Sequence, residues 1–197
     1  RIDRTRARLT EIASLIAQDM ALSTKVLRVA NSAFYNFPQQ ISSINQAVSI
    51  LGLNAVRSLV LSFSFLSLGK RRKKSLFDFE QFWQRSLVEA AGTKLILEQL
   101  PNVNTEEAFT CGLLQNIGEL IFATTLHQQY DQLLENLKSQ DITESEAQEA
   151  ELKRLEQELL GISHTDVGYE VAKMWGLPDS LLLPIKYHHQ PLAYEGK

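Results

Sequence analysis

The sequence predicts an all-α fold, a multi-helix bundle arranged in two packed helical halves. Apolar residues recur at helical spacing along most of the chain, which has only 5 prolines. The alternation typical of strands is nearly absent, and no Asn-Gly or Asp-Gly dipeptide marks a hairpin. Hydrophobic residues make up 44% of the 197 residues, which is enough for a substantial core.

The first two helices are predicted near the start of the chain. The first rests on four apolar residues at helical spacing, Leu9, Ile12, Leu15 and Ile16. Asp19 offers an N-cap for a second helix that runs through Ala30, and Pro38 prevents its continuation.

A short helix over residues 44–51 follows from its caps. Ser43 and Gln46 have the spacing of a capping box, and Gly52 is suited to end the helix. Asn54 then caps a helix over about 55–68 that is apolar on most sides, so we expect it to be central. The stretch 51–68 is too short and too polar for a membrane span.

A basic run separates residues 1–69 from residues 78–197, the two halves of one domain. It consists of Lys70, Arg71, Arg72, Lys73 and Lys74, within a linker at 70–77. The run fits a solvated linker, or a site for phosphate or an anionic partner. It is short and contains no aromatic residue, which favours the linker.

The second half opens with two long helices. Asp78 precedes one that runs to about Leu100, where Pro101 closes it. Asn104 and Glu107 form a capping box for the next, which we expect to continue to about Leu126.

Four shorter patterns complete the second half. The next helix is marked by Tyr130, Leu133, Leu134 and Leu137. Thr143 and Glu146 cap an acidic helix that ends at Gly161 and has an inner stripe of Leu152, Leu155 and Leu159. Ser163 and Asp166 cap a helix through Trp175, which Gly176 ends. Pro178 lies in the first turn of the last helix, which ends near His189.

The composition limits which classes of function and which cellular compartments are expected for this chain. The net charge of −3 argues against a basic nucleic-acid binder. A single cysteine, Cys111, excludes an internal disulfide and fits a reducing, cytoplasmic location. No signal peptide is visible, and a start at Arg1 rather than Met suggests part of a longer protein.

Polar residues in apolar surroundings mark a candidate site. Gln115 and Asn116 adjoin each other inside the apolar stretch 113–118. His164 and the pair His188 and His189 each lie at an end of a predicted helix, whereas His127 has the position of a structural histidine.

The chain resembles the HDOD domain, a bacterial all-α module related to the HD and HD-GYP metal-dependent phosphohydrolases. The similarity is carried by residues 21–61, "FWQRSL" at 82–87, "EEAFTCGLLQNIGELIF" at 106–122, "LGISHTDVGYEVAKMWGLP" at 160–178 and "IKYHHQP" at 185–191. The active relatives hold one or two metals through an early histidine, a His-Asp doublet and later histidines.

The resemblance places the early histidine at Arg85, the doublet at Gln115 and Asn116, and the later histidines at His164 and at His188 or His189. Neutral amides are weak metal donors, and a permanently protonated arginine has no acceptor at all. We therefore predict no divalent metal, no cofactor and no phosphohydrolase activity. The residues instead form a satisfied polar network or, alternatively, bind an anion such as a nucleotide phosphate through Arg85.

The resemblance implies a non-catalytic signalling module that acts through protein contacts, with receiver, GGDEF, EAL or kinase domains as partners. The alternatives are a metal-dependent phosphohydrolase with altered ligands and a nucleotide or anion sensor. Phe34, Tyr35 and Phe37 lie in a predicted loop. They are expected to pack between the halves, or alternatively to anchor a partner together with the basic run.

Overall fold

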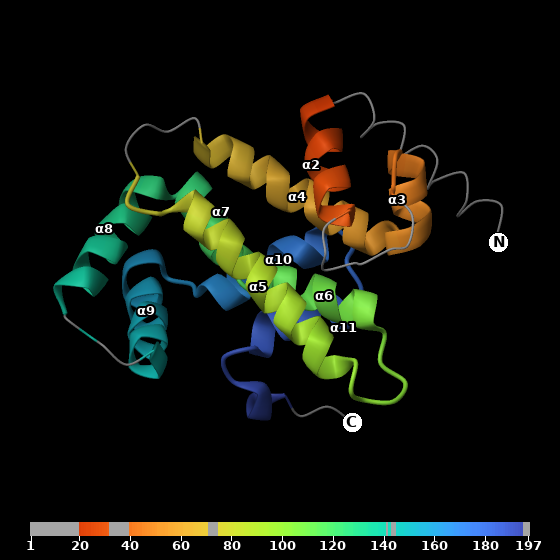
Figure 1. Ribbon diagram of the computed structural model, residues 1–197. Coiled ribbons are helices and arrows are strands. Elements are labelled where there is room, and N and C mark those ends of the chain that lie inside the picture. Colours follow the sequence, from red (N-terminus) through yellow and green to blue (C-terminus); the bar gives the residue numbers. More distant parts are fainter. Residues whose placement is uncertain (1–19, 32–39, 71–74, 141, 143–144, 195–197) are drawn as a thin grey trace. The chain divides into compact units, whose positions relative to one another are not determined.

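The computed structural model describes residues 20–31, 40–70, 75–140, 142 and 145–194 (Figure 1). These residues form helices and contain no strand, which confirms the all-α prediction. The chain divides into two compact units, Arg1–Ser64 and Phe65–Lys197, which are described separately below. No helix among the described residues has the length and apolar character that crossing a membrane requires.

Several predicted features lie outside the described residues. They are the first helix with Leu9 to Ile16, the cap Asp19, the loop aromatics Phe34, Tyr35 and Phe37, the basic residues 71–74, and the cap Thr143. Lys70 is the last residue of a helix, but its side chain is not described.

The first unit contains α2 (Met20–Ala30), α3 (Ile44–Leu51) and the start of α4 (Leu53–Lys70). Asn31 holds the end of α2 to the start of the next segment, because its side-chain amide both donates to and accepts from the Ile41 backbone at 2.7 Å. The local signals for α3 are confirmed, since Ser43 Oγ accepts from the Gln46 N–H at 3.2 Å and Gly52 ends the helix with φ 84°.

Two details of the first unit differ from prediction. Gln46 Oε1 accepts from the N–H of Ser42 rather than that of Ser43, so the capping box reaches one residue further back. Asn54 is not a cap, because α4 already begins at Leu53; the Asn54 carbonyl instead accepts from Ser58 Oγ at 2.8 Å. The burial expected of α4 is present at Val56, Leu59 and Phe63.

The second unit is a set of packed helices: α5 (Phe79–Leu97), α6 (Thr105–Leu114), α7 (Ile117–Thr125), α8 (His127–Ser139), α9 (Ser145–Leu160), α10 (His164–Met174), α11 (Asp179–Tyr187) and the 3-10 helix η1 (Pro191–Ala193). α5 packs along α6, α8 packs on α9, and α10 packs on both α7 and α11. The largest fully buried side chains include Tyr130, Phe109 and Phe122.

The helix predicted from Asn104 to Leu126 is interrupted. α6 ends at Leu114, and α7 begins at Ile117 after Asn116 leaves helical geometry with φ −99° and ψ 16°. Consecutive residues of a continuous helix point about 100° apart, so two neighbouring amides would diverge. The break lets both amides reach the same partner on α5, a contact that no local sequence signal encodes.

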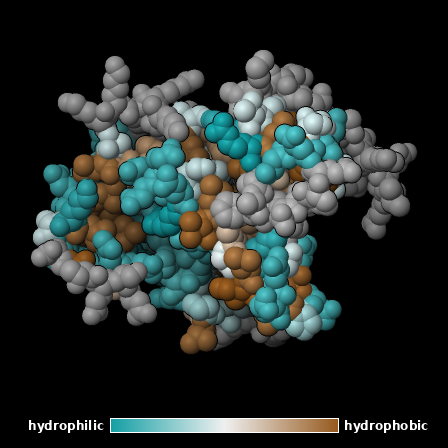
Figure 2. Space-filling model, in the orientation of Figure 1, coloured by the Kyte–Doolittle hydropathy of each residue, from teal (hydrophilic) through white to brown (hydrophobic). Residues whose placement is uncertain are grey.

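The inner face of α9 also differs from prediction. Leu155 is buried as expected and Leu152 is half-buried, but Leu159 is 44% exposed. Glu156 occupies the inner face instead, with 0% exposure. An apolar area lies beside α8 and α9 on the viewed face of this unit (Figure 2). α9 therefore turns a carboxylate inward while leaving a leucine in solvent.

The remaining helix ends need small corrections. α5 ends at Leu97, earlier than the predicted Leu100, and α11 ends at Tyr187 rather than near His189. Pro178 lies at the N-cap of α11 and not in its first turn. Gly161 and Gly176 follow α9 and α10 with positive φ of 74° and 70°, as their predicted role as helix terminators requires.

Candidate functional site

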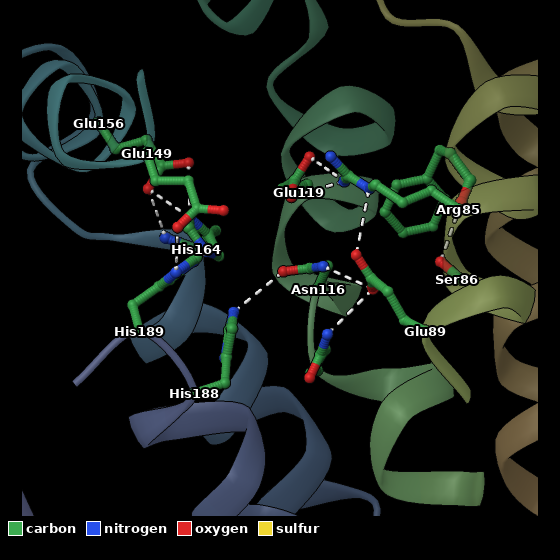
Figure 3. A network of polar contacts seen from close by, with 12 residues as sticks. Arg85, Ser86, Glu89, Asn116, Glu119, Glu149, Glu156, His164, His188 and His189 are labelled. Carbon is green, nitrogen blue, oxygen red and sulfur yellow. Dashed lines mark hydrogen bonds and ion pairs between the residues drawn. The ribbon is translucent and has the colours of Figure 1, made fainter. Parts of the chain in front are cut away.

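One polar network in the second unit contains all six residues predicted for the pocket. They are Arg85, Gln115, Asn116, His164, His188 and His189, from α5, the α6–α7 break, the start of α10 and the end of α11. Figure 3 shows two groups, one around Glu89 and one around the histidines, which His188 and Asn116 link.

Arg85 is neutralised by a carboxylate of α7. Its Nη2 donates to both oxygens of Glu119 at 2.8 Å, and its Nε lies 3.8 Å from Glu89 Oε1. Burial lowers the pKa of Arg85, but the nearby Glu119 carboxylate more than offsets this and leaves the pKa raised. The guanidinium is therefore already committed to a partner within the protein.

Glu89 is the shared hydrogen-bond partner of the two adjacent amides. Gln115 Nε2 and Asn116 Nδ2 both donate to Glu89 Oε2 at 3.0 Å. Burial raises the pKa of Glu89, and this outweighs the lowering by the Gln115 hydrogen bond and the charge of Arg85. Both amides thus present donors, not acceptors, to the centre of this group.

His164 is held by a buried carboxylate. Glu156 accepts from the His164 backbone N–H at 2.8 Å, and its two oxygens lie 2.8 and 3.0 Å from His164 Nδ1. Burial lowers the pKa of His164, but the hydrogen bond that Glu156 accepts and the negative charge of Glu156 together outweigh burial, and the pKa is raised. The ring therefore keeps a proton on Nδ1, which points at Glu156.

His188 and His189 complete the histidine group. His188 Nδ1 lies 3.0 Å from the Ile185 carbonyl, and His188 Nε2 lies 3.0 Å from Asn116 Oδ1. Burial, followed by the charges of His189 and His164, lowers the pKa of His188 to about 3, so the ring is neutral and its single proton serves one of these oxygens.

His189 lies between a carboxylate and another imidazole. Its Nδ1 is 3.2 Å from Glu149 Oε2, and its Nε2 is 3.0 Å from His164 Nε2. Burial and then the charge of His164 lower the pKa of His189. Among the described residues, one ring nitrogen from each of the three histidines lies within 4.8 Å of the others.

The two groups differ in how they suit the metals of the active relatives. Around Glu89, the amide N–H groups and the Arg85 guanidinium engage the carboxylates of Glu89 and Glu119 and present positive edges, so this side does not fit a cation. The histidine side fits one metal ion, since imidazole nitrogens are strong donors and three of them converge.

Sequence reasoning missed the four carboxylates of the site, Glu89, Glu119, Glu149 and Glu156. Glu89 lies one turn after Arg85 on α5, a spacing that pairs opposite charges and was a usable signal. Glu119 interrupts the apolar run of α7, which also pointed to a buried partner. Glu149 and Glu156 belong to a helix with many acidic residues, where nothing distinguished a buried one.

Comparison with known proteins gives the family. The HDOD domain family model matches residues 1–191. An HDOD domain protein of unknown function from Geobacter sulfurreducens is 30% identical with a TM-score of 0.69, over 95% of this chain and 60% of that chain. A candidate phosphohydrolase from Shewanella amazonensis SB2B is 27% identical with a TM-score of 0.66, over 94% of this chain and 62% of that one.

A candidate signal transduction protein from Marinobacter aquaeolei VT8 is also similar, with 26% identity and a TM-score of 0.62, over 95% of this chain and 40% of that one. Among curated relatives, the chain spans 35% of a protein from Treponema pallidum and 31% of YuxH from Bacillus subtilis. The family match covers nearly the whole sequence, and its helical fold is the one that these structures share. The chain belongs to the HDOD domain family.

Proposed function

We propose that this HDOD domain is a non-catalytic regulatory module of bacterial signal transduction that acts through contacts with other proteins or domains. The observation that carries the proposal is the occupation of the doublet positions by Gln115 and Asn116, whose amide groups donate to Glu89. A structural relative described as a candidate signal transduction protein supports the regulatory part.

Hydrolysis of a phosphate ester on this fold requires a metal-activated water beside the phosphorus atom. The amide side offers no carboxylate for a bridging role, because Glu89 already accepts from both amides and Glu119 is paired with Arg85. A phosphohydrolase with altered ligands is favoured only by the three histidines, and the carboxylates beside them, Glu149 and Glu156, are engaged with the Nδ1 atoms of His189 and His164.

An anion sensor is disfavoured by the same contacts. Arg85 would be the cation for a phosphate, but Glu119 takes Nη2 at 2.8 Å through both of its oxygens. A phosphate would have to displace this carboxylate and leave it close to its own negative charge, which is unfavourable.

Turnover assays test the catalytic half of the proposal. The purified chain is incubated with Mn²⁺, Fe²⁺ or Zn²⁺ and with cyclic dinucleotides, nucleoside monophosphates or nucleoside triphosphates. The expected rate equals that of the His164→Ala variant for every pair. A rate that exceeds background and disappears in this variant would overturn the proposal.

The regulatory half is tested by binding. The chain spans 35% of a curated relative, and the partners to test are separately purified receiver, GGDEF, EAL and kinase domains. Their binding to this domain is measured by calorimetry. Phe34→Ala and a variant with neutral residues at 70–74 then locate the surface. Loss of binding at unchanged thermal stability assigns the surface, whereas Phe34→Ala that unfolds the domain assigns Phe34 to the core.

A further inference from the structure

We propose that the exposed face of α5 is a dimer interface, on which α5 of a second copy of this chain packs antiparallel and crosses it at Gly92. The apolar part of this face, the α5 stripe, consists of Val88, Gly92, Leu95 and Ile96. Residues three and four positions apart lie on the same side of a helix. The inference goes beyond the proposed function, which concerns contacts with other proteins or domains.

The α5 stripe is exposed along a helix whose opposite side is buried. Val88, Leu95 and Ile96 are 68%, 64% and 70% exposed, whereas Phe82 and Ala90 of the same helix are buried. Apolar side chains are visible along the course of α5 in Figure 2. A single exposed apolar residue is ordinary, but several on one side of one helix mark a surface that another molecule covers.

Gly92 has no role in the packing of the described residues. A Cβ atom at this position would have nothing within 4 Å. At Gly112 of α6, by contrast, a Cβ atom would lie 2.7 Å from the Ala90 Cα of α5, so that glycine permits close helix packing. Glycine inside a helix costs about 0.5–1 kcal/mol relative to alanine. A second backbone that approaches the α5 stripe would give Gly92 the role that Gly112 has inside the chain.

The shape of the α5 stripe suits a copy of itself. Most dimers of one chain are two-fold symmetric, and the same patch then meets itself. In an antiparallel pair with the two-fold axis at Ala91 and Gly92, Val88 of each copy lies opposite Leu95 of the other. The small residues at the crossing let the helices approach, and the larger ones pack on both sides of the axis.

The charge of this face also favours a second copy. The stripe has no charged residue, and the residues that extend it, Gln84 and Gln99, are neutral and exposed. An amide carries both donors and an acceptor, so glutamines can pair with glutamines. The same antiparallel pairing places Gln84 of one copy opposite Gln99 of the other. An acidic or basic partner would find no opposite charge along this line.

We expect the dimer to be weak. One helix face covers less than the roughly 800 Å² that each partner buries in a standard interface, so a dissociation constant on the order of 10–100 μM is expected. Sedimentation equilibrium of the whole chain, over concentrations from about 5 μM to about 1 mM, measures the association.

Three variants test the interface in this experiment. Leu95→Glu should weaken association at least 100-fold, because each dimer would then bury two carboxylates among apolar side chains. Gly92→Ala should weaken it about 10-fold, because the added methyl groups hold the helices apart, while the same change stabilises the monomer. Leu192→Glu is the matched control, since Leu192 is a 97% exposed leucine of η1, and it should associate as the native chain does.

The antiparallel arrangement is tested by cross-linking. Val88→Cys and Leu95→Cys chains, mixed and oxidised mildly, should form a disulfide with each other. Either variant alone should form little, because its two cysteines would lie about 10 Å apart along the helix axes. Cys111 does not compete, because it is half-buried and burial raises the pKa of its thiol to about 12.

A chain that stays monomeric at all concentrations would overturn the dimer and leave the regulatory function standing. Val88→Cys alone that cross-links as well as the mixture would overturn the antiparallel pairing. Leu95→Glu that lowers the thermal midpoint of the dilute, monomeric chain would also overturn the interface, because it would show that the chain itself covers the stripe. Concentration-dependent association that only Leu95→Glu and Gly92→Ala weaken supports the proposal.

Discussion

At the scale of single residues, Glu156 is the side chain on which the histidine group depends most. It is fully buried and accepts from the backbone and the ring of His164. A buried carboxylate is tolerated only with such partners, and removing one member of a buried pair leaves the other without compensation.

We predict that Glu156→Leu lowers the free energy of unfolding by about 3–5 kcal/mol. Glu156→Gln retains one acceptor for the His164 N–H and should cost less, about 1–3 kcal/mol. Urea denaturation followed by circular dichroism measures both. Glu158→Gln, on the exposed side of the same helix, is the control and should leave the midpoint unchanged. Equal midpoints for Glu156→Leu and the native chain would contradict the prediction.

The site residues differ in how far the sequence predicts them. The positions of His164, His188 and the amide pair are predicted from the family motifs, because each of these residues lies inside a motif that the sequence preserves. Glu156 does not, because burial of an acidic side chain depends on the start of α10, which lies beyond a turn and is held by the His164 N–H. Arg85 was predicted as the cation of the pocket, and only the structure shows that Glu119 neutralises it.

At the scale of elements, the break between α6 and α7 is followed by a tightly packed glycine, Gly118, in the first turn of α7. A Cβ atom at this position would lie 1.9 Å from the His164 carbonyl oxygen. The start of α10 therefore approaches the first turn of α7 so closely that only glycine fits. This contact places the start of α10 against α7 at a position two residues after Asn116.

Gly118→Ala is predicted to destabilise the protein by about 3 kcal/mol or more, because backbone rather than a flexible side chain must move. Gly92→Ala in α5 is the matched control. Nothing lies within 4 Å of its added Cβ. A helical alanine there should stabilise by about 0.5–1 kcal/mol. Chemical denaturation of the two variants measures the difference, and changes of the same sign would refute this account of Gly118.

Elements whose ends depend on neighbouring residues are predictable. The caps at Ser43, Asp78, Asn104 and Ser163 each accept from a backbone N–H two or three residues ahead. The α6–α7 break was missed because its causes, Glu89 and the backbone of His164, lie far away in the sequence. The burial predicted for Leu159 was wrong for the same reason, since the position of His164 decides which side of α9 is buried.

At the scale of the whole molecule, the division into units falls inside α4, between Ser64 and Phe65. The sequence places the division at the basic run 70–77, where charge interrupts the apolar pattern, and that boundary stays a prediction. A helix is continuous because of its local hydrogen bonds, so its sequence does not reveal where long-range packing changes. All described contacts of the candidate site lie within the second unit.

We predict that residues 65–197 fold cooperatively on their own. Leu133 of α8 is fully buried in this unit. Leu133→Ala should therefore cost about 2–5 kcal/mol in the fragment. If the core is self-contained, the whole chain should show the same loss to within about 0.5 kcal/mol. Urea unfolding of four proteins, fragment and whole chain each with and without the substitution, measures both values. A fragment that unfolds without a sigmoidal transition, or a Leu133→Ala effect confined to the whole chain, would show that the second unit requires the first.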